Sequence, residues 1–229
     1  MSVSSAGGLF VDPTSVILIG DDRPLLGWVA YALAFRQDPD FRWVELRTKG
    51  EVLNDSDPVV RGAIPPDRLK IVRPSEFSPD HATANLGVSG VIRGDELPEN
   101  VQILLDFLRL PQRTQVALSG DASRAGSMTY VLSNAHRLGS LYPAESVGPL
   151  LRAIQATGAT TIMTFADAPN NGRLAFDVVV HLRGHVSEDW KQVTLKVEKG
   201  RSSGPLPPGS ELRLGDLPAL AEILARHLP

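Results

Sequence analysis

The chain has 229 residues, a formal net charge of −3, 42% apolar and 21% charged residues, which is typical of a globular protein of one large domain. This charge gives no reason to expect nucleic acid or an anionic membrane as a partner. The absence of cysteine excludes disulfides, thiolate catalysis and zinc–thiolate sites. The sequence has neither a signal-peptide pattern nor an apolar run of the roughly 20 residues that cross a bilayer, so we expect a cytoplasmic location.

The elements in chain order predict an α/β protein. Ser15–Ile19 is a continuous apolar run, as in a strand buried on both faces. After a polar turn, Pro24 suits the first turn of a heavily buried helix over Leu25–Phe35. Further strands are predicted at Phe41–Leu46, Arg68–Val72, Met128–Leu132, Thr160–Phe165, Phe176–Leu182 and Gln192–Glu198, and further helices at Leu97–Leu110, Ala144–Thr157 and from Asp216 onward.

The spacing of these elements predicts a mostly parallel sheet. Repeated strand–helix–strand units imply right-handed crossovers, and the last two strands are too close for a crossover helix, so they predict an antiparallel hairpin. We divide the chain into a lead-in (1–14), an α/β domain (15–200), a linker rich in Pro and Gly (201–215) and a C-terminal amphipathic helix (216–229). The apolar stripe of that helix, which favours docking on the same chain, comprises Leu217, Leu220, Leu224 and Leu228.

Polar residues follow the strands at the edge where open α/β sheets bind ligands. The predicted ligand-binding face comprises Gly20, Asp21, Asp22, Arg23, Ser133, Asn134 and Asp167. A phosphate-binding loop that began at Gly20 would need Gly, Lys and Ser or Thr at positions 25 to 27, where the chain has Leu25, Leu26 and Gly27. Asp21 and Asp22 would also repel a triphosphate. The loop is therefore in the right place for nucleotide but has the wrong chemistry.

The strand Met128–Leu132 shows a second loss. A Walker B strand is an apolar run that ends in an Asp, which holds Mg²⁺. Here Ser133 and Asn134 stand at the acidic position, and neither carries the charge that a divalent ion requires. We therefore expect no catalytic residues, no metal, no cofactor and no ATPase activity.

The order of these segments resembles the RecA-like ATPase domain of the KaiC family. The similarity runs from the strand and loop at Ser15–Pro24 through SMTYVLSNAHRL, ATTIMTF and RLAFDVVVHLRG to VTLKVEKGRSS. It implies a three-layer RecA-like fold of the P-loop NTPase type. In that family a Lys-x-Arg motif reaches the nucleotide of the neighbouring subunit, and Lys199-Gly200-Arg201 matches its spacing. The Walker motifs, which are the most specific part of the family pattern, are missing here.

The first thirty residues after Ser15 also resemble a response-regulator receiver domain. That resemblance implies that Asp21 and Asp22 bind Mg²⁺ beside a phospho-accepting Asp on the third strand. The third predicted strand ends in Val72-Arg73-Pro74 and has no such Asp. The simpler interpretation of Asp21 and Asp22 is that they cap the following helix, and we prefer it.

These observations lead to one functional hypothesis and two rivals. We expect a non-catalytic RecA-like scaffold or regulatory protein that contacts a protein partner or itself, as a homo-oligomer, with Lys199, Arg201 and Trp190 as interface candidates. A solvated basic turn is the alternative for Lys199 and Arg201. The rival functions are an ATPase with an atypical phosphate loop, using Asp21, Asp22 and Asp167 around a metal, and a degenerate receiver-like signalling module.

Overall fold

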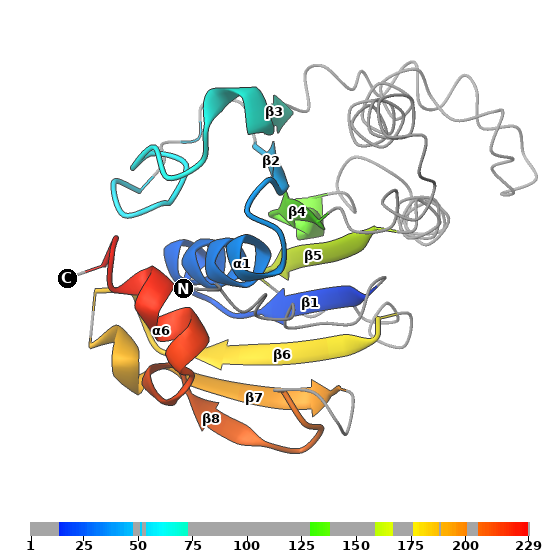
Figure 1. Ribbon diagram of the computed structural model, residues 1–229, viewed down its shortest axis with the longest axis vertical. Coiled ribbons are helices and arrows are strands. Elements are labelled where there is room, and N and C mark those ends of the chain that lie inside the picture. Colours follow the sequence, from blue (N-terminus) through cyan, green and yellow to red (C-terminus); the bar gives the residue numbers. More distant parts are fainter. Residues whose placement is uncertain are drawn as a thin grey trace, which may run out of the picture.

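The computed structural model describes residues 14–47, 51, 54–72, 129–137, 159–166, 176–187, 189–200 and 206–228. These residues form one sheet with two α-helices on it (Figure 1). Its strands are β1 (Ser15–Ile19), β2 (Arg42–Leu46), β3 (Leu69–Val72), β4 (Thr129–Ser133), β5 (Thr160–Phe165), β6 (Val178–Arg183), β7 (Thr194–Lys199) and β8 (Glu211–Arg213). The helices are α1 (Arg23–Gln37) and α6 (Pro218–Leu224).

The sheet is mostly parallel. Its strand order is β3-β2-β4-β5-β1-β6-β7-β8, and every neighbouring pair from β3 to β6 is parallel. The pairs β6–β7 and β7–β8 are antiparallel. The predicted α/β class, parallel sheet and C-terminal hairpin are therefore confirmed. β1 lies between β5 and β6 with all five residues buried, as its continuous apolar run predicted.

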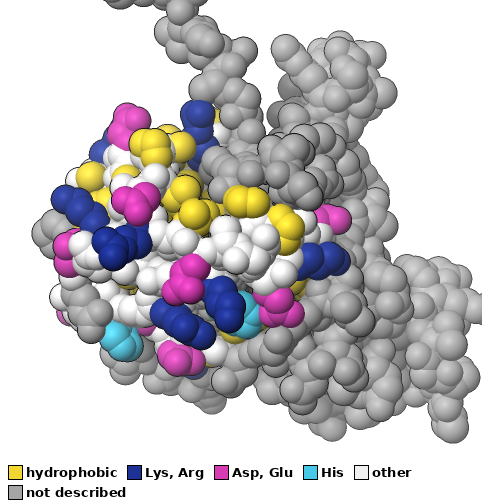
Figure 2. All heavy atoms as spheres, turned by 90° about the horizontal axis from the view of Figure 1, so that it is seen from below, with side chains coloured by type: hydrophobic (Ala, Val, Ile, Leu, Met, Phe, Trp, Pro, Cys, Tyr) yellow, Lys and Arg dark blue, Asp and Glu magenta, His cyan; other side chains and the backbone are white. Residues whose placement is uncertain are grey.

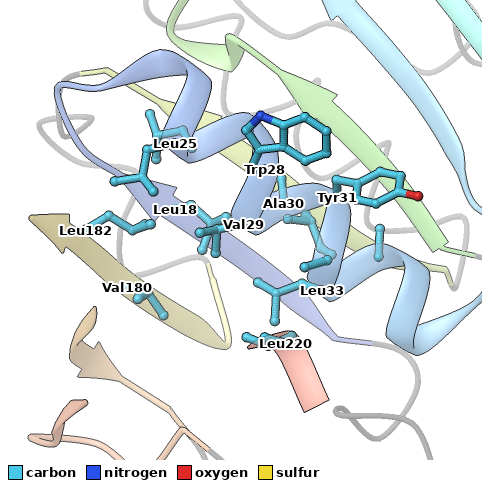
Figure 3. Close-up of a cluster of buried hydrophobic side chains, with 14 of the residues drawn as sticks. Leu18, Leu25, Trp28, Val29, Ala30, Tyr31, Leu33, Val180, Leu182 and Leu220 are labelled. Carbon is cyan, nitrogen blue, oxygen red and sulfur yellow. The ribbon is translucent and has the colours of Figure 1, made fainter. Parts of the chain in front are cut away.

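Helix α1 is buried at every residue from Pro24 to Ala34 because the sheet covers one side and α6 another. In Figure 3, Val29 lies against Leu18 of β1 and Leu33 lies near Leu220 of α6. The chain passes from the end of β1 to the start of α1 within three residues, Gly20 to Asp22. The N-terminus of α1 therefore stands at the carboxyl edge of the sheet.

Helix α6 docks on α1 of the same chain. Leu220, Leu224 and Leu228 of the predicted stripe are buried. The ring of His227 stacks on Trp28 with centroids 5.2 Å apart. Burial and then the nearby Arg226 lower the pKa of His227, which disfavours the charged form of the stacked ring.

The C-terminal part departs from the sequence prediction in two ways. The last α-helix begins at Pro218 instead of Asp216, since proline is favoured in a first helical turn and keeps the preceding residue out of helical geometry. The segment 211–213, which we predicted as linker, forms β8 and pairs with β7. A turn at Gly209 (φ +78°) reverses the chain, and the three residues after it suffice for pairing.

Other predictions lie outside the described residues. They are the helices Leu97–Leu110 and Ala144–Thr157 and the positions of Asp167 and Arg201. Of the helices that the structure describes, none is both long enough and apolar enough to span a bilayer.

Candidate functional site

A crevice of about 370 Å³ opens at the carboxyl edge of the sheet. Its walls come from the turn before α1, the ends of β2 and β4, and the residues Glu51, Asn54, Asp57 and His185. Five of the seven predicted ligand-face residues line it, namely Asp21, Asp22, Arg23, Ser133 and Asn134. Gly20 is not among the residues that line it. The sequence therefore predicted that these five residues lie together, because parallel strands end at one edge.

Asp22 is the N-cap of α1. Its Oδ1 accepts a hydrogen bond from the backbone N–H of Leu25 at 2.9 Å. Its Oδ2 accepts from the backbone N–H of Val186 at 3.1 Å and lies 3.1 Å from Nδ1 of His185. Both oxygens are therefore used within the chain, and the capping interpretation is correct for this residue.

The turn before α1 has no room for a phosphate-binding loop. Only Gly20, Asp21 and Asp22 separate β1 from α1, and Leu25 and Leu26 are already buried helical residues. A side chain at Gly20 would place its Cβ 3.0 Å from the carbonyl oxygen of Leu182 on β6. The glycine thus serves close packing between β1 and β6, and it does not open a loop around phosphates.

Sequence reasoning missed the most deeply buried acid of the crevice, Glu45. This residue of β2 is 1% exposed, and burial raises its pKa to about 7, although hydrogen bonding from Trp43 opposes the shift. Its Oε2 accepts from Nε1 of Trp43 at 2.9 Å and its Oε1 from Nδ2 of Asn134 at 2.6 Å. The available signal was a Glu two residues after Trp43 in a strand that has only one other polar residue, Arg42, since residues two apart share one face.

Asn134 holds the turn after β4 in place. Its φ of +58° lies in the left-handed region, which Asn tolerates better than most residues. Its backbone N–H donates to Oγ1 of Thr164 at 2.8 Å while its side chain donates to Glu45. Ser133 also hydrogen-bonds Glu45 through its side chain. Ser133 and Asn134, which we compared with the Walker B acid, therefore both hydrogen-bond the buried acid Glu45.

The remaining carboxylates of the crevice differ in their environment. Asp57 is partly buried, which raises its pKa, and its Oδ1 accepts from the backbone N–H of Val59 at 2.8 Å. The Glu51 carboxylate pairs with Arg23 and Arg137. Asp21 is exposed and has no hydrogen bond or ion pair to another described residue.

Neither of the described interface candidates, Lys199 and Trp190, is among the residues that line the crevice. Lys199 is opposite Val179, near the amino end of β6, so it stands at the other edge of the sheet. Its ammonium group donates to the carbonyl oxygen of Phe176. Trp190 is 3% exposed, which makes our interpretation of it as a surface contact wrong. The short helical turn Trp190–Gln192 places its ring in the core, with Nζ of Lys191 5.8 Å from the ring centroid.

Comparisons with other proteins do not identify the chain. Within the described part of the chain, no three His, Asp or Glu side chains are grouped in a way that could hold a metal ion. No protein-family model matches the sequence, and no curated protein matches it significantly. The resemblances to RecA-like ATPases and to receiver domains therefore stay predictions.

Replacing Glu45 with Gln tests the buried acid. The folded protein holds the Glu45 proton up to a pKa of about 7, whereas the unfolded chain releases it near the usual 4.5. Wild-type stability should therefore fall as pH rises from about 4.5 to 7, by about 3 kcal/mol from this residue alone. Glu45→Gln removes this loss because Gln does not titrate. Rotation of the Asn134 amide gives the new NH₂ group an acceptor, so this new donor is not left unsatisfied.

We therefore expect urea unfolding to show that Glu45→Gln gains stability relative to wild type between pH 5 and pH 8. Glu222→Gln is the matched control, since the Glu222 side chain is 73% exposed and pairs only with Arg226 one helical turn away. A difference in the free energy of unfolding between Glu45→Gln and wild type that stays constant with pH would contradict the raised pKa of Glu45.

Proposed function

We propose that the chain is a RecA-like module that does not hydrolyse ATP and that acts through protein contacts. The mostly parallel sheet, the position of α1 directly after the central strand and the terminal antiparallel hairpin support the RecA-like part of this proposal. The non-catalytic part rests on the hydrogen bonds and ion pairs that the carboxylates of the crevice make within the chain.

The observation that carries the proposal is that the crevice uses its own acids for structure. Asp22 caps α1, Glu45 is held by Trp43 and Asn134, and Glu51 pairs with two arginines. A metal or a reacting group would have to break these contacts, and breaking the contact of a buried donor such as Nε1 of Trp43 would cost about 1–3 kcal/mol. Of the described carboxylates that line the crevice, Asp21 alone has no such partner.

Electrostatics also opposes a nucleotide at this edge. The N-terminus of a helix attracts phosphate through its free N–H groups and its positive end. Here the carboxylate of Asp22 already accepts from the N–H of Leu25, and Asp21 adds a second negative charge beside it. The ATPase and receiver alternatives both need Asp22 for a metal, and both of its oxygens accept hydrogen bonds from other parts of the chain.

Calorimetric titration with ATP and Mg²⁺ tests the non-catalytic part. We expect no saturable heat at ligand concentrations up to about 1 mM, because the phosphate position is capped and acidic. Leu26→Lys should not restore binding, since residue 26 is 2% exposed and faces the core. Mg²⁺-dependent binding of ATP with micromolar affinity would sink this part of the proposal and favour the atypical ATPase.

The protein contact that we propose joins the two opposite edges of the sheet. Lys199 stands at the amino edge and Asp21 at the carboxyl edge, so the two cannot meet within one chain but can meet between neighbours packed head to tail. The Lys199 side chain is exposed, and its ammonium group donates to the carbonyl oxygen of Phe176. An exposed contact of this kind is worth up to about 1 kcal/mol.

The edge strand β8 does not favour strand pairing with another chain as an alternative contact. β8 is only three residues long, and Glu211 and Arg213 are exposed. In the view toward this edge, Lys and Arg side chains lie interspersed with Asp and Glu (Figure 2). Short, charged edges resist pairing with strands of other chains, so this edge protects the sheet from extension.

Light scattering at low and high salt tests the contact. We expect wild type to associate at low salt and to dissociate as salt rises, because exposed charge pairs are screened. The variant Lys199→Glu/Arg201→Glu should lose the association. Lys196→Glu, on the same strand and exposed, is the control and should keep it. A wild type that stays monomeric at high protein concentration and low salt would rule self-association out, and an oligomer indifferent to both changes would place the interface elsewhere.

A further inference from the structure

A buried arginine lies beside the crevice. Arg137 ends the short helical turn Ala135–Arg137 that follows β4, and it is 6% exposed. Two nitrogens of its guanidinium group donate to the two carboxylate oxygens of Glu51, with NH2 2.5 Å from Oε1. Because a buried guanidinium cannot lose its proton, it needs a negative partner at this place.

A second arginine reaches the same carboxylate from another element. Arg23, the first residue of α1, places NH1 2.5 Å from Oε1 of Glu51. The exposed fractions of the side chains are 46% for Arg23, 15% for Glu51 and 7% for Arg137. Arg23 and Glu51 line the crevice, so Glu51 lies between the crevice and the buried arginine.

The arrangement suits an oxyanion in general. The guanidinium fork of Arg137 matches carboxylate and phosphate equally well, and NH1 of Arg23 adds a further charge-assisted hydrogen bond to the same group. We propose that Arg23 and Arg137 form a subsite for one carboxylate or phosphate group of a small ligand of the crevice, and that Glu51 occupies this subsite as an internal competitor. The ligand carries one oxyanion group rather than a triphosphate. This choice of ligand rests on the proposed function, in which Asp22 closes the nucleotide position.

Glu51 sets the affinity that an external anion can reach. A carboxylate of the same chain competes as if it were present at about millimolar concentration or above, so a weakly binding anion does not displace it. Removing its charge should expose the two arginines to anions from solution. It should also lower stability, because the buried Arg137 would then lose the carboxylate to which two of its nitrogens donate.

The test is thermal melting of wild type, Glu51→Gln and Glu222→Gln in inorganic phosphate, acetate or chloride at constant ionic strength. We expect Glu51→Gln to melt at lower temperature than wild type. Phosphate should raise its melting temperature in a saturable way, with a half-saturating concentration at least about tenfold lower than for wild type. Glu222→Gln removes an exposed Arg–Glu pair and should respond as wild type does. A rise with acetate too assigns the subsite to carboxylate as well as phosphate, and a rise with phosphate alone assigns it to phosphate.

Two further variants keep the test decisive. If Glu51→Gln does not fold without added anion, Glu51→Asp keeps the charge, weakens the two-arginine contact and should show the same response at a smaller amplitude. Arg137→Lys in the Glu51→Gln background should abolish the response, because lysine lacks the fork.

A Glu51→Gln variant that responds to phosphate no more than wild type would overturn the proposal, and so would a response that survives Arg137→Lys. ATP binding by wild type bears on the proposed function alone, because these measurements use no nucleotide.

Discussion

The carboxylate of Asp22 is the constraint on which the carboxyl edge of the sheet depends. It fixes the start of α1 by accepting a hydrogen bond from the backbone N–H of Leu25. It also holds the segment after β6 at the same point by accepting from the backbone N–H of Val186. Since α1 follows β1 after only three residues, this cap also fixes the distance between the helix end and the central strand. In the proposed function, the same contact also closes the place where a P-loop protein holds its phosphates.

The second fixed point is the group around Glu45. This acid joins β2 to the turn after β4, because Trp43 and Asn134 both donate to it. A charge on Glu45 above pH 7 is costly. Removal of the whole carboxyl group would nevertheless leave the donors of Trp43 and Asn134 without an acceptor. Together with the Asp22 cap, the group around Glu45 explains how a crevice rich in carboxylates can lie at the functional edge of an α/β sheet and still be committed to internal contacts.

The sequence predicted what depends on local pattern and missed what depends on distant partners. The apolar run Ser15–Ile19 and the polar residues after β1 and β4 were enough to place the central strand and five of the eleven residues that line the crevice, because parallel strands end together. The role of Glu51 could not be predicted, since its partner Arg137 is 86 residues away. Trp190 was misplaced because a charged neighbourhood suggests exposure, whereas a short helical turn there directs the ring inward.

The stability of Asp22→Ala compared with Asp21→Ala tests the central claim most directly. A residue kept for binding or catalysis often destabilises the fold, so its removal leaves stability unchanged or raises it, whereas removal of an N-cap lowers it. The account predicts that Asp22→Ala lowers the free energy of unfolding by about 1–3 kcal/mol, through the lost cap and the unpaired N–H of Val186. It predicts a change within about 0.5 kcal/mol for the exposed Asp21→Ala. An Asp22→Ala protein as stable as wild type, or more stable, would contradict it.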